Sequence, residues 1–415
     1  MRVLAIIDTL ALGGGAERLV VSLVPELARL GVRVDVVSLV ATPTDLGDEL
    51  EAQGFSVRRL AVASPWAMAS ILPSLAKIVR QGDYDLVWGH LFFGNLYASL
   101  ATLVGRTKRA VTTHHSPVHF NQSWKSRLLA QVQKRVVSRL AAQTVAVSGG
   151  LANEYARLLA WTRPAVIHNG VCLHSLRAAS ANRELTAAMR KKYRGAEFTI
   201  LVPARLVPAK GHKYLLEALQ QLEVQHGWQP RLVLLGSGCE KPGLVSQARA
   251  LGIDSRVKFF DAIPQAELFA LMSVVDVVVL PSLREPFGLA AAEAMALGRP
   301  TILTRVGGFM EIVGDSHSAL LIEPENSAAM ADALWCVHRD VAQMRRMRTH
   351  ARRRIRERFD IRECAASWAR LFASVGVALP SPDRREAEIY KMPAVARPAV
   401  SLAGECRASA AQIQS

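Results

Sequence analysis

Short apolar runs alternate with amphipathic segments along the first part of the chain. These runs cover residues 2–8, 32–40, 57–62, 85–90, 109–114, 144–148 and 164–169. The segments between them have the periodicity of helices. Strands of a parallel sheet are near-continuous apolar runs, because helices cover both faces of such a sheet. The pattern therefore predicts a parallel α/β domain.

The same pattern starts again in the second part of the chain. Its apolar runs cover residues 197–205, 230–238, 256–262, 275–282, 299–304 and 318–324. Two such sets predict an α/β protein with two Rossmann-like domains, each a doubly wound parallel sheet. We place the first domain at residues 1–175 and the second at residues 176–358.

Two helices and a polar segment are predicted at the end of the chain. The arginine-rich residues 341–358 fit a solvated helix, and residues 360–377 fit another helix. Beyond them, residues 377–415 contain prolines and alanines without any periodicity. This composition predicts a disordered tail.

Length and composition are those of a globular protein of the cytoplasm. The 415 residues suffice for two domains, and no apolar run approaches the length of a membrane-spanning helix. The first residues resemble a signal peptide, but Asp8 interrupts the apolar stretch and a glycine-rich turn follows, so a buried strand is predicted instead. The five cysteines are scattered and odd in number, which fits a reducing compartment and argues against a disulfide framework.

The net charge of +16 is unevenly distributed along the sequence. Residues 339–358 hold nine arginines against two acids, and residues 123–143 hold five Lys or Arg and no acid. Such a balance favours nucleic acid, an anionic membrane surface or anionic substrates as partners. In segment 123–143 apolar residues such as Trp124 and Leu128 accompany the basic ones. This helix either rests on an anionic membrane or packs on the protein with a solvated basic face.

Two glutamates, Glu285 and Glu293, stand in the segment REPFGLAAAEAMALGRP (284–300), which follows an apolar strand. Pro286 is suited to the first turn of a helix, so Glu285 is predicted just before the helix start and Glu293 roughly 12 Å further along it. The small residues between them let a ligand approach the backbone, and the free N–H groups of a helix start bind anions. The arrangement suits a nucleotide-sugar, with one carboxylate on hexose hydroxyls and the other on ribose hydroxyls. The alternative is that both glutamates are solvated.

Two cations, Arg205 and Lys210, follow the first strand of the predicted second domain in the segment PARLVPAKG (203–211). The carboxyl ends of parallel strands border the ligand cleft of such a sheet. Paired cations stabilise the charge that grows on a departing nucleoside diphosphate. These two residues are therefore candidates for contacts to the diphosphate.

Glycines and histidines follow several other strands. The segment GGGAER (13–18) does not match the dinucleotide fingerprint, because Arg18 occupies the last glycine position, so an NAD or FAD site is disfavoured. Its glycines still permit close approach of a substrate, as do those of LLGSG (234–238) and TRVGGF (304–309). The histidines at strand ends are predicted to line a polar cleft wall; they are His90, His114, His115 and His168. Their spacing does not favour a zinc site.

With these motifs, the chain resembles the retaining glycosyltransferases of family 4, which have the GT-B fold. The resemblance covers about residues 1–376, and its most specific part is EPFGLAAAEAMALGRP (285–300). PARLVPAKG, VIHNGV, LLGSG, VGGFMEIV, TTHHS and GGGAER stand in the family's order. The resemblance implies two Rossmann-like domains facing each other across a cleft. It also implies that a C-terminal helix, at about residues 359–376, crosses back onto the first domain.

The resemblance also implies roles for individual residues. Glu285 would hold the donor hexose, and Glu293 the ribose. Arg205 and Lys210 would hold the diphosphate, and His115 would lie near the sugar. The remaining donor contacts would come from Phe287, Gly288, Leu289, Gly14, Gly15 and Gly236.

The expected activity is transfer of a hexose from a UDP- or GDP-sugar to a glycan or lipid-linked acceptor, with retention at the anomeric carbon. The expected pathway is synthesis of cell-surface polysaccharide or lipopolysaccharide, in the cytoplasm or peripherally on the inner face of the membrane. No cofactor and no metal are expected, since the nucleotide-sugar is a co-substrate and cationic side chains replace a metal. The alternatives are a basic nucleic-acid- or membrane-binding protein and a catalytically silent GT-B scaffold. Nucleic acid is disfavoured, because few aromatic residues accompany the arginines.

Overall fold

A computed structural model gives the architecture of the chain. It describes residues 1–42, 45–62, 64–104, 107, 109–116, 124–159, 163–194, 197–314 and 317–375, without the side chains of 68–69, 124–130 and 158–159. The predicted disordered tail, residues 377–415, lies outside the described residues. None of the described helices is long and apolar enough to span a membrane.

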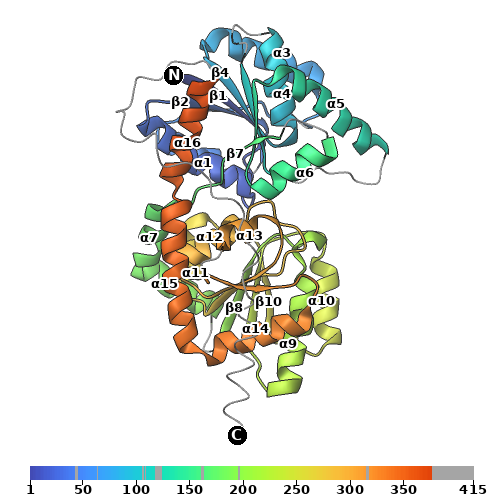
Figure 1. Cartoon of the computed structure of the whole chain (residues 1–415), viewed down its shortest axis with the longest axis vertical. Helices are drawn as coiled ribbons and strands as arrows, with labels where there is room; N and C mark the ends of the chain where they lie inside the picture. Colours follow the sequence, from blue (N-terminus) through green and yellow to red (C-terminus); the bar gives the residue numbers. More distant parts are fainter. Residues whose placement is uncertain are drawn as a thin grey trace.

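The first sheet has seven parallel strands in the order β3-β2-β1-β4-β5-β6-β7. The strands are β1 (Arg2–Thr9), β2 (Arg33–Val40), β3 (Val57–Arg59), β4 (Leu86–His90), β5 (Ala110–His114), β6 (Gln143–Ala146) and β7 (Ala165–Val166). The helices between them are α1 (Gly15–Arg29), α2 (Gly47–Ala52), α3 (Met68–Gly82), α4 (Leu91–Val104), α5 (Trp124–Leu140) and α6 (Gly149–Leu159). Alternate residues of β1 enter different cores, Val3, Ala5 and Ile7 on one face and Leu4 and Ile6 on the other. Figure 1 shows helices on both faces of this sheet.

The second sheet has six parallel strands in the order β10-β9-β8-β11-β12-β13. The strands are β8 (Thr199–Pro203), β9 (Arg231–Leu235), β10 (Val257–Phe260), β11 (Val277–Leu280), β12 (Thr301–Thr304) and β13 (Leu320–Ile322). Its helices are α9 (His212–His226), α10 (Lys241–Ala250), α11 (Gln265–Val274), α12 (Leu289–Ala296), α13 (Gly307–Val313), α14 (Ser327–Arg339) and α15 (Val341–Arg358). Each predicted apolar run contains one strand, so the prediction of two doubly wound α/β units is confirmed. In each sheet the order of the strands changes direction next to the first strand, between β1 and β4 in the first sheet and between β8 and β11 in the second. Sheets of this kind bind ligands at such a point.

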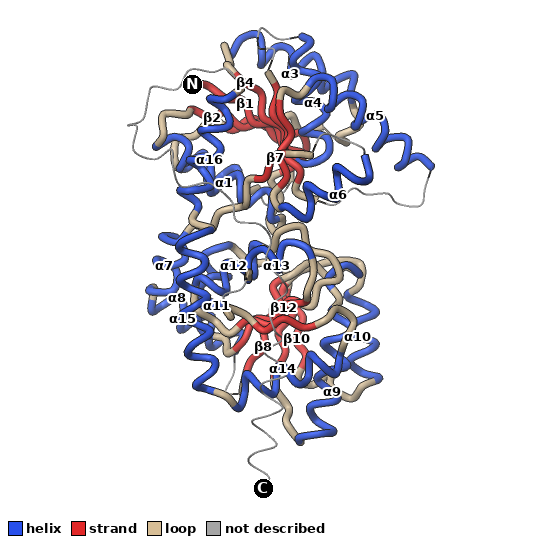
Figure 2. The backbone as a smooth tube through the Cα atoms, viewed as in Figure 1, coloured by secondary structure: helices blue, strands red, loops and turns tan. Residues whose placement is uncertain are grey.

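Two segments of the chain cross between the sheets (Figure 2). The first leads from β7 to α7 (Leu173–Ala181), which α8 (Arg183–Met189) and a π-helical turn (Arg190–Arg194) follow. The second leads from α15 to α16 (Ile361–Ser374), which packs on the first sheet, with the ring centroid of Trp368 4.6 Å from that of Trp88. The crossings hold each other through the Val171 N–H, which donates to the Phe359 carbonyl at 2.7 Å. The last helix thus completes the core of the first sheet.

The arginine-rich helix α15 is solvated on one face and packed on the other, so the prediction of a solvated helix holds for one face only. Arg348 donates to the Gly298 carbonyl at 2.8 Å, and Arg352 donates to the Leu297 carbonyl at 3.0 Å. Arg354 likewise donates to two carbonyl groups at the end of α13, those of Ile312 and Glu311. Cations next to the last carbonyls of a helix compensate its dipole. The charge of α15 therefore fixes the ends of α12 and α13, the helices that follow β11 and β12.

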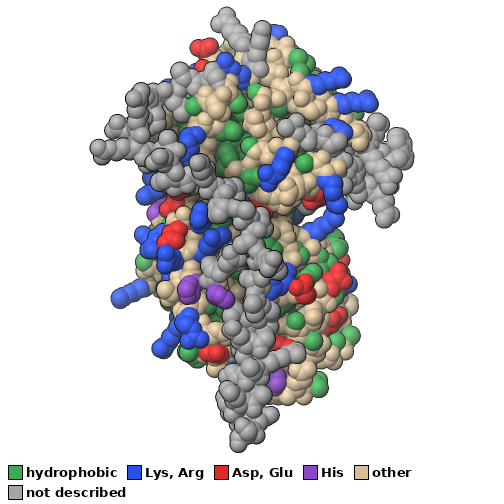
Figure 3. Space-filling model, viewed as in Figure 1, with side chains coloured by type: hydrophobic (Ala, Val, Ile, Leu, Met, Phe, Trp, Pro, Cys, Tyr) green, Lys and Arg blue, Asp and Glu red, His purple; other side chains and the backbone are tan. Residues whose placement is uncertain are grey.

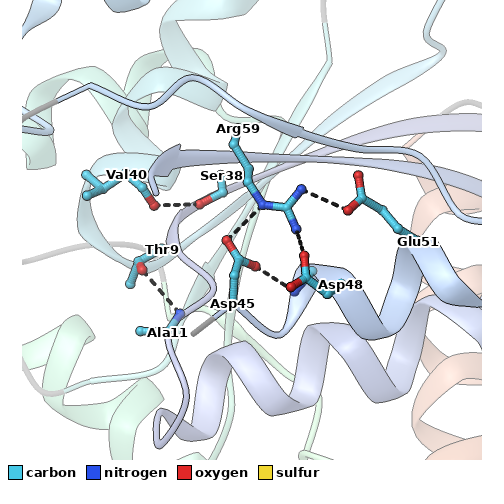
Figure 4. A network of polar contacts seen from close by, with 9 residues as sticks. Thr9, Ala11, Ser38, Val40, Asp45, Asp48, Glu51 and Arg59 are labelled. Carbon is cyan, nitrogen blue, oxygen red and sulfur yellow. Dashed lines mark hydrogen bonds and ion pairs between the residues drawn. The ribbon is translucent and has the colours of Figure 1, made fainter. Parts of the chain in front are cut away.

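One cation, Arg59, joins edge strand β3 to helix α2 (Figure 4). Its guanidinium lies 3.0 Å from Asp45, 2.6 Å from Asp48 and 2.9 Å from Glu51. The side chain of Asp45 is 5% exposed, whereas that of Asp48 is 76% exposed. The buried member of the network therefore depends on Arg59 for its countercharge.

We expect Arg59→Ala to lower the free energy of unfolding by about 2 kcal/mol, between the values of exposed and buried ion pairs. Urea denaturation at low and high salt measures this loss, which should shrink only slightly at high salt because Asp45 is shielded. The neighbouring Arg58 is exposed and serves as the control. An equal loss in Arg58→Ala would contradict a specific role of the network.

Candidate active site

The segment between β11 and α12 carries the predicted sugar-binding glutamate, Glu285. Helix α12 begins at Leu289, three residues later than the start predicted from Pro286. The reason is Gly288, whose φ of 104° lies in the left-handed region and which precedes the first helical residue. A Cβ on Gly288 would lie 2.5 Å from the ring of Phe309. Glu285 is consequently a loop residue before the helix, and the neighbouring Phe287 is buried.

The structure brings Lys210 and Glu285 together, although 75 residues separate them. Lys210 ends a short 3₁₀ turn (Pro208–Lys210) after β8, and its Nζ lies 2.6 Å from Oε2 of Glu285. The two side chains are only 17% and 11% exposed. Ser282 adds a longer contact, since its hydroxyl donates to the same carboxylate oxygen at 3.4 Å. A largely buried ion pair thus stands at the carboxyl edge of β8 and β11.

The second predicted glutamate, Glu293, lies inside the protein on α12. Its side chain is 4% exposed, which excludes the alternative of a solvated helix residue. Its Oε2 has no hydrogen-bond partner among the described residues. Burial raises the pKa of Glu293 to about 7, although the charge of Arg18 and a hydrogen bond from Gln265 act in the opposite direction. Such a buried and incompletely paired carboxylate is typical of a ligand site.

The cation Arg205 and the glycine Gly236 belong to two loops that form one rim. Arg205 is exposed, directly after β8. The Leu206 N–H donates to the Ser237 carbonyl at 2.9 Å, which joins the loop after β8 to the loop after β9. A Cβ on Gly236 would collide with the Ala204 carbonyl. Only glycine permits this close packing beside Arg205.

The glycine-rich loop of the first domain reaches the second domain. Helix α1 begins at Gly15, which Gly14 precedes. A Cβ on Gly15 would lie 3.7 Å from the side chain of Leu289, and one on Gly13 would lie 3.6 Å from Ala262. The structure therefore brings Gly14 and Gly15 next to the start of α12, and the carboxyl edges of the two sheets face each other across the site.

Two charged residues in the first turn of α1, Glu17 and Arg18, are functional candidates that sequence reasoning missed. Glu17 is buried, with its carboxylate against Gly14, and burial raises its pKa, while the charges of Arg205 and Arg18 lower it. Arg18 lies on the first domain, and its positive charge lowers the pKa of Glu293 on the second domain. The start of α1 thus presents a carboxylate to Arg205 and a cation to Glu293. Their position directly after the first glycines was the only available signal.

Three of the strand-end histidines lie in the protein interior. His90 and His114 are 0% and 2% exposed, so the prediction that they line a polar cleft wall is wrong. His115 is 9% exposed, and its Nε2 lies 3.0 Å from Nδ1 of His90. Burial lowers the pKa of His114 and of His115 to about 3, and lowers that of His90 well below its usual value. The pair is therefore neutral at physiological pH, and one ring donates to the other.

Asp8, which interrupts the first apolar run, caps a helix. Its carboxylate accepts from the N–H groups of Gly94 at 2.6 Å and Phe93 at 3.3 Å, in the first turn of α4. Burial raises the pKa of Asp8 to about 7, although these hydrogen bonds lower it. Asp8 therefore serves the geometry of the first domain at the end of β1.

The site combines a rim of cations with buried carboxylates at the start of a helix. Lys210, Arg205 and the first N–H groups of α12 can bind an anionic ligand. Glu285 and Glu293 can accept hydrogen bonds from hydroxyl groups. Within the described residues, no cluster of three His, Cys, Asp or Glu side chains has the arrangement of a metal site.

Comparisons with known proteins identify both halves of the chain. The family model of "Glycosyltransferase Family 4" matches residues 13–175, and that of "Glycosyl transferases group 1" matches residues 187–354. The chain is 30% identical to a D-inositol 3-phosphate glycosyltransferase of Nocardioides sp., over 77% of each chain. It is 28% identical to the enzyme of that name from Corynebacterium urealyticum, over 77% of this chain and 81% of the relative.

A solved structure has the same fold. The Anabaena protein HepE, in complex with UDP-glucose, superimposes with a TM-score of 0.77 at 22% sequence identity, and the match covers 90% of this chain and 100% of HepE. The two facing parallel sheets, the two family models and the Nocardioides relative all point to one family. The chain belongs to the family 4 glycosyltransferases with the GT-B fold.

Proposed function

We propose that the protein transfers a hexose from a UDP- or GDP-sugar to an acceptor hydroxyl, with retention at the anomeric carbon. The observation that carries this proposal is the Lys210–Glu285 pair on the same sheet edge as the buried carboxylate of Glu293. It places a cation and two hydroxyl-binding groups around the start of α12. The UDP-glucose complex of HepE supports a UDP-sugar as the donor.

In this mechanism the second domain binds the donor. Glu293 accepts from the ribose hydroxyls and Glu285 from the hexose hydroxyls. Lys210, Arg205 and the N–H groups of α12 stabilise the charge that develops on the β-phosphate as the glycosidic bond breaks. The positive charge in this scheme comes from side chains and the helix start rather than from a metal ion. The leaving phosphate oxygen accepts the proton of the acceptor hydroxyl, which attacks from the same face of the sugar.

The first domain carries the acceptor in this proposal, a glycan or a lipid-linked sugar of a cell-surface polysaccharide or lipopolysaccharide. Helix α5 supports a cytoplasmic protein bound peripherally to the inner membrane surface. In its described part Val132 is 44% exposed, whereas Val137 and Gln133 are buried. Trp124 and Leu128, the apolar residues singled out in the sequence of this helix, lie outside the described side chains. An exposed valine beside basic residues suits the surface of an anionic membrane.

Nucleic-acid binding receives no comparable support. Lys and Arg side chains are spread over both halves of the face in Figure 3, with Asp and Glu side chains among them. A nucleic-acid site would need a continuous basic stripe, with aromatic side chains for single strands.

A panel of UDP-, GDP- and ADP-sugars tests the proposed function. We expect the sugars of one nucleotide class to raise the unfolding temperature of the protein. We also expect a nucleotide-sugar of that class to be hydrolysed slowly in the absence of acceptor. Hydrolysis should proceed equally with EDTA present, because the scheme uses no metal. If no donor of the panel is bound or cleaved, the proposal is wrong.

A further inference from the structure

Glu311 lies on α13 of the second domain, but both oxygens of its carboxylate bind the first domain. Oε2 accepts from the Gly149 N–H at 2.9 Å, and Oε1 accepts from the Gly150 N–H at 2.8 Å. These are the first two residues of α6. Nε2 of His168, in the crossing after β7, lies 2.8 Å from Oε2. We call this group of Glu311, Gly149, Gly150 and His168 the interdomain latch.

Electrostatics favour the latch. Burial alone would raise the pKa of Glu311, but the hydrogen bonds from His168, Gly150 and Gly149 outweigh it and lower the pKa. The carboxylate is therefore charged at neutral pH. It faces the positive end of α6, where two N–H groups have no partner within their own helix. Hydrogen bonds from N–H groups to a carboxylate are among the stronger ones in proteins.

Helix α13 also holds the loop that carries Glu285. The Gly308 N–H donates to the Glu285 carbonyl at 2.9 Å. At the other end of the helix, Arg354 donates to the Ile312 carbonyl at 3.0 Å and to the Glu311 carbonyl at 2.9 Å. Continuous contacts thus lead from Glu285 through α13 and the latch to α6 of the first domain.

We propose that Glu311 is a positioning residue, which sets the distance between the donor segment around Glu285 and the acceptor-side domain. This inference rests on the proposed function, in which each domain carries one substrate. Transfer between two bound substrates requires the reacting atoms about 3–3.5 Å apart, and a displacement of about 1 Å can cost about 100-fold in rate. Without the latch the domains remain linked by the two crossings, but their relative position is no longer fixed.

The test compares Glu311→Gln and Glu311→Ala with Glu184→Gln, which changes an exposed carboxylate on α8. Gln keeps one acceptor oxygen but loses the charge and the second acceptor. In both Glu311 variants we expect amide exchange in the first turn of α6 to rise about tenfold and the radius of gyration to increase. The kcat of UDP-sugar hydrolysis should fall at least about tenfold, whereas the dissociation constant of UDP changes less than about twofold, because the second domain binds UDP. His168→Ala should add little to Glu311→Ala, since both remove the same contact.

Two results would overturn the inference. One is unchanged exchange and unchanged radius of gyration in Glu311→Ala. The other is a loss of UDP affinity as large as the loss of kcat, which would show that Glu311 only supports the second domain itself. Amide exchange and the radius of gyration, measured by X-ray scattering, need no donor. They therefore test whether the latch holds the two domains even if the wild-type protein cleaves no nucleotide-sugar. That last result would count against the proposed function alone.

Discussion

Lys210→Ala is expected to lower the rate of donor cleavage by about 100- to 1000-fold, the usual effect of removing one preorganised group that stabilises developing charge. Lys210 lies 2.6 Å from Glu285, and both side chains are shielded from water. In the proposed mechanism, the substitution removes positive charge where the leaving diphosphate becomes more negative. It also leaves the carboxylate of Glu285 without its countercharge beside that anion. Both effects raise the energy of the transition state more than that of the bound donor, so kcat falls more than the affinity for UDP.

Single-turnover hydrolysis of the preferred donor, together with calorimetric titration of UDP, measures the two effects separately. Lys213→Ala is the matched control, because Lys213 lies three residues further along the chain and is exposed on α9. Lys210→Arg should restore only part of the rate, since a guanidinium has a different shape from an ammonium group. Wild-type kcat in Lys210→Ala would remove Lys210 from the mechanism.

Much of the fold could be predicted because its physical cause is local. A strand covered on both faces must be apolar throughout its buried part, as residues 3–7 of β1 and all residues of β11 are. The strand ends then place Lys210 and Glu285 at one edge of the second sheet. Their ion pair could not be predicted, because it depends on β8 lying next to β11, which is a property of the sheet order. The start of α12 was placed too early, because the conformation of Gly288 outweighs the preference of Pro286 for a first turn.

The sequence around each residue gives no indication of the contacts between the two domains. Arg18 and Glu311 have their partners on the opposite domain, and only the relative position of the two sheets brings them together. The histidines show the same limit, since a strand end can lead to a contact with the other domain, as at His168, or remain in the interior, as at His90. In α15, the arginines that hold other helices have the same local pattern as the solvated ones. Their function depends on helix ends that are distant in sequence.

Glu293→Gln is expected to stabilise the free protein at alkaline pH and to impair donor binding. The pKa of Glu293 is raised from 4.5 to about 7, chiefly by burial, so the folded protein binds a proton more tightly than the unfolded chain. Stability from this group is therefore complete below the unfolded pKa and is lost as the pH rises through about 7. At about pH 8 the loss is on the order of 3 kcal/mol, at about 1.4 kcal/mol per pH unit. Glutamine carries no charge and avoids this loss.

Chemical denaturation at about pH 5 and about pH 8 measures the prediction. The stabilisation by Glu293→Gln should be clear at the higher pH and nearly absent at the lower one, and Glu184→Gln should show neither. Binding of UDP should weaken by about 10- to 100-fold, because in the proposed mechanism an amide oxygen replaces the carboxylate that accepts from the ribose hydroxyls. If Glu293→Gln is not more stable at about pH 8, the countercharge of Arg18 already compensates the buried carboxylate in the free protein. If the replacement of Glu293 stabilises the fold and lowers the affinity for UDP, the burial of this carboxylate serves binding rather than folding.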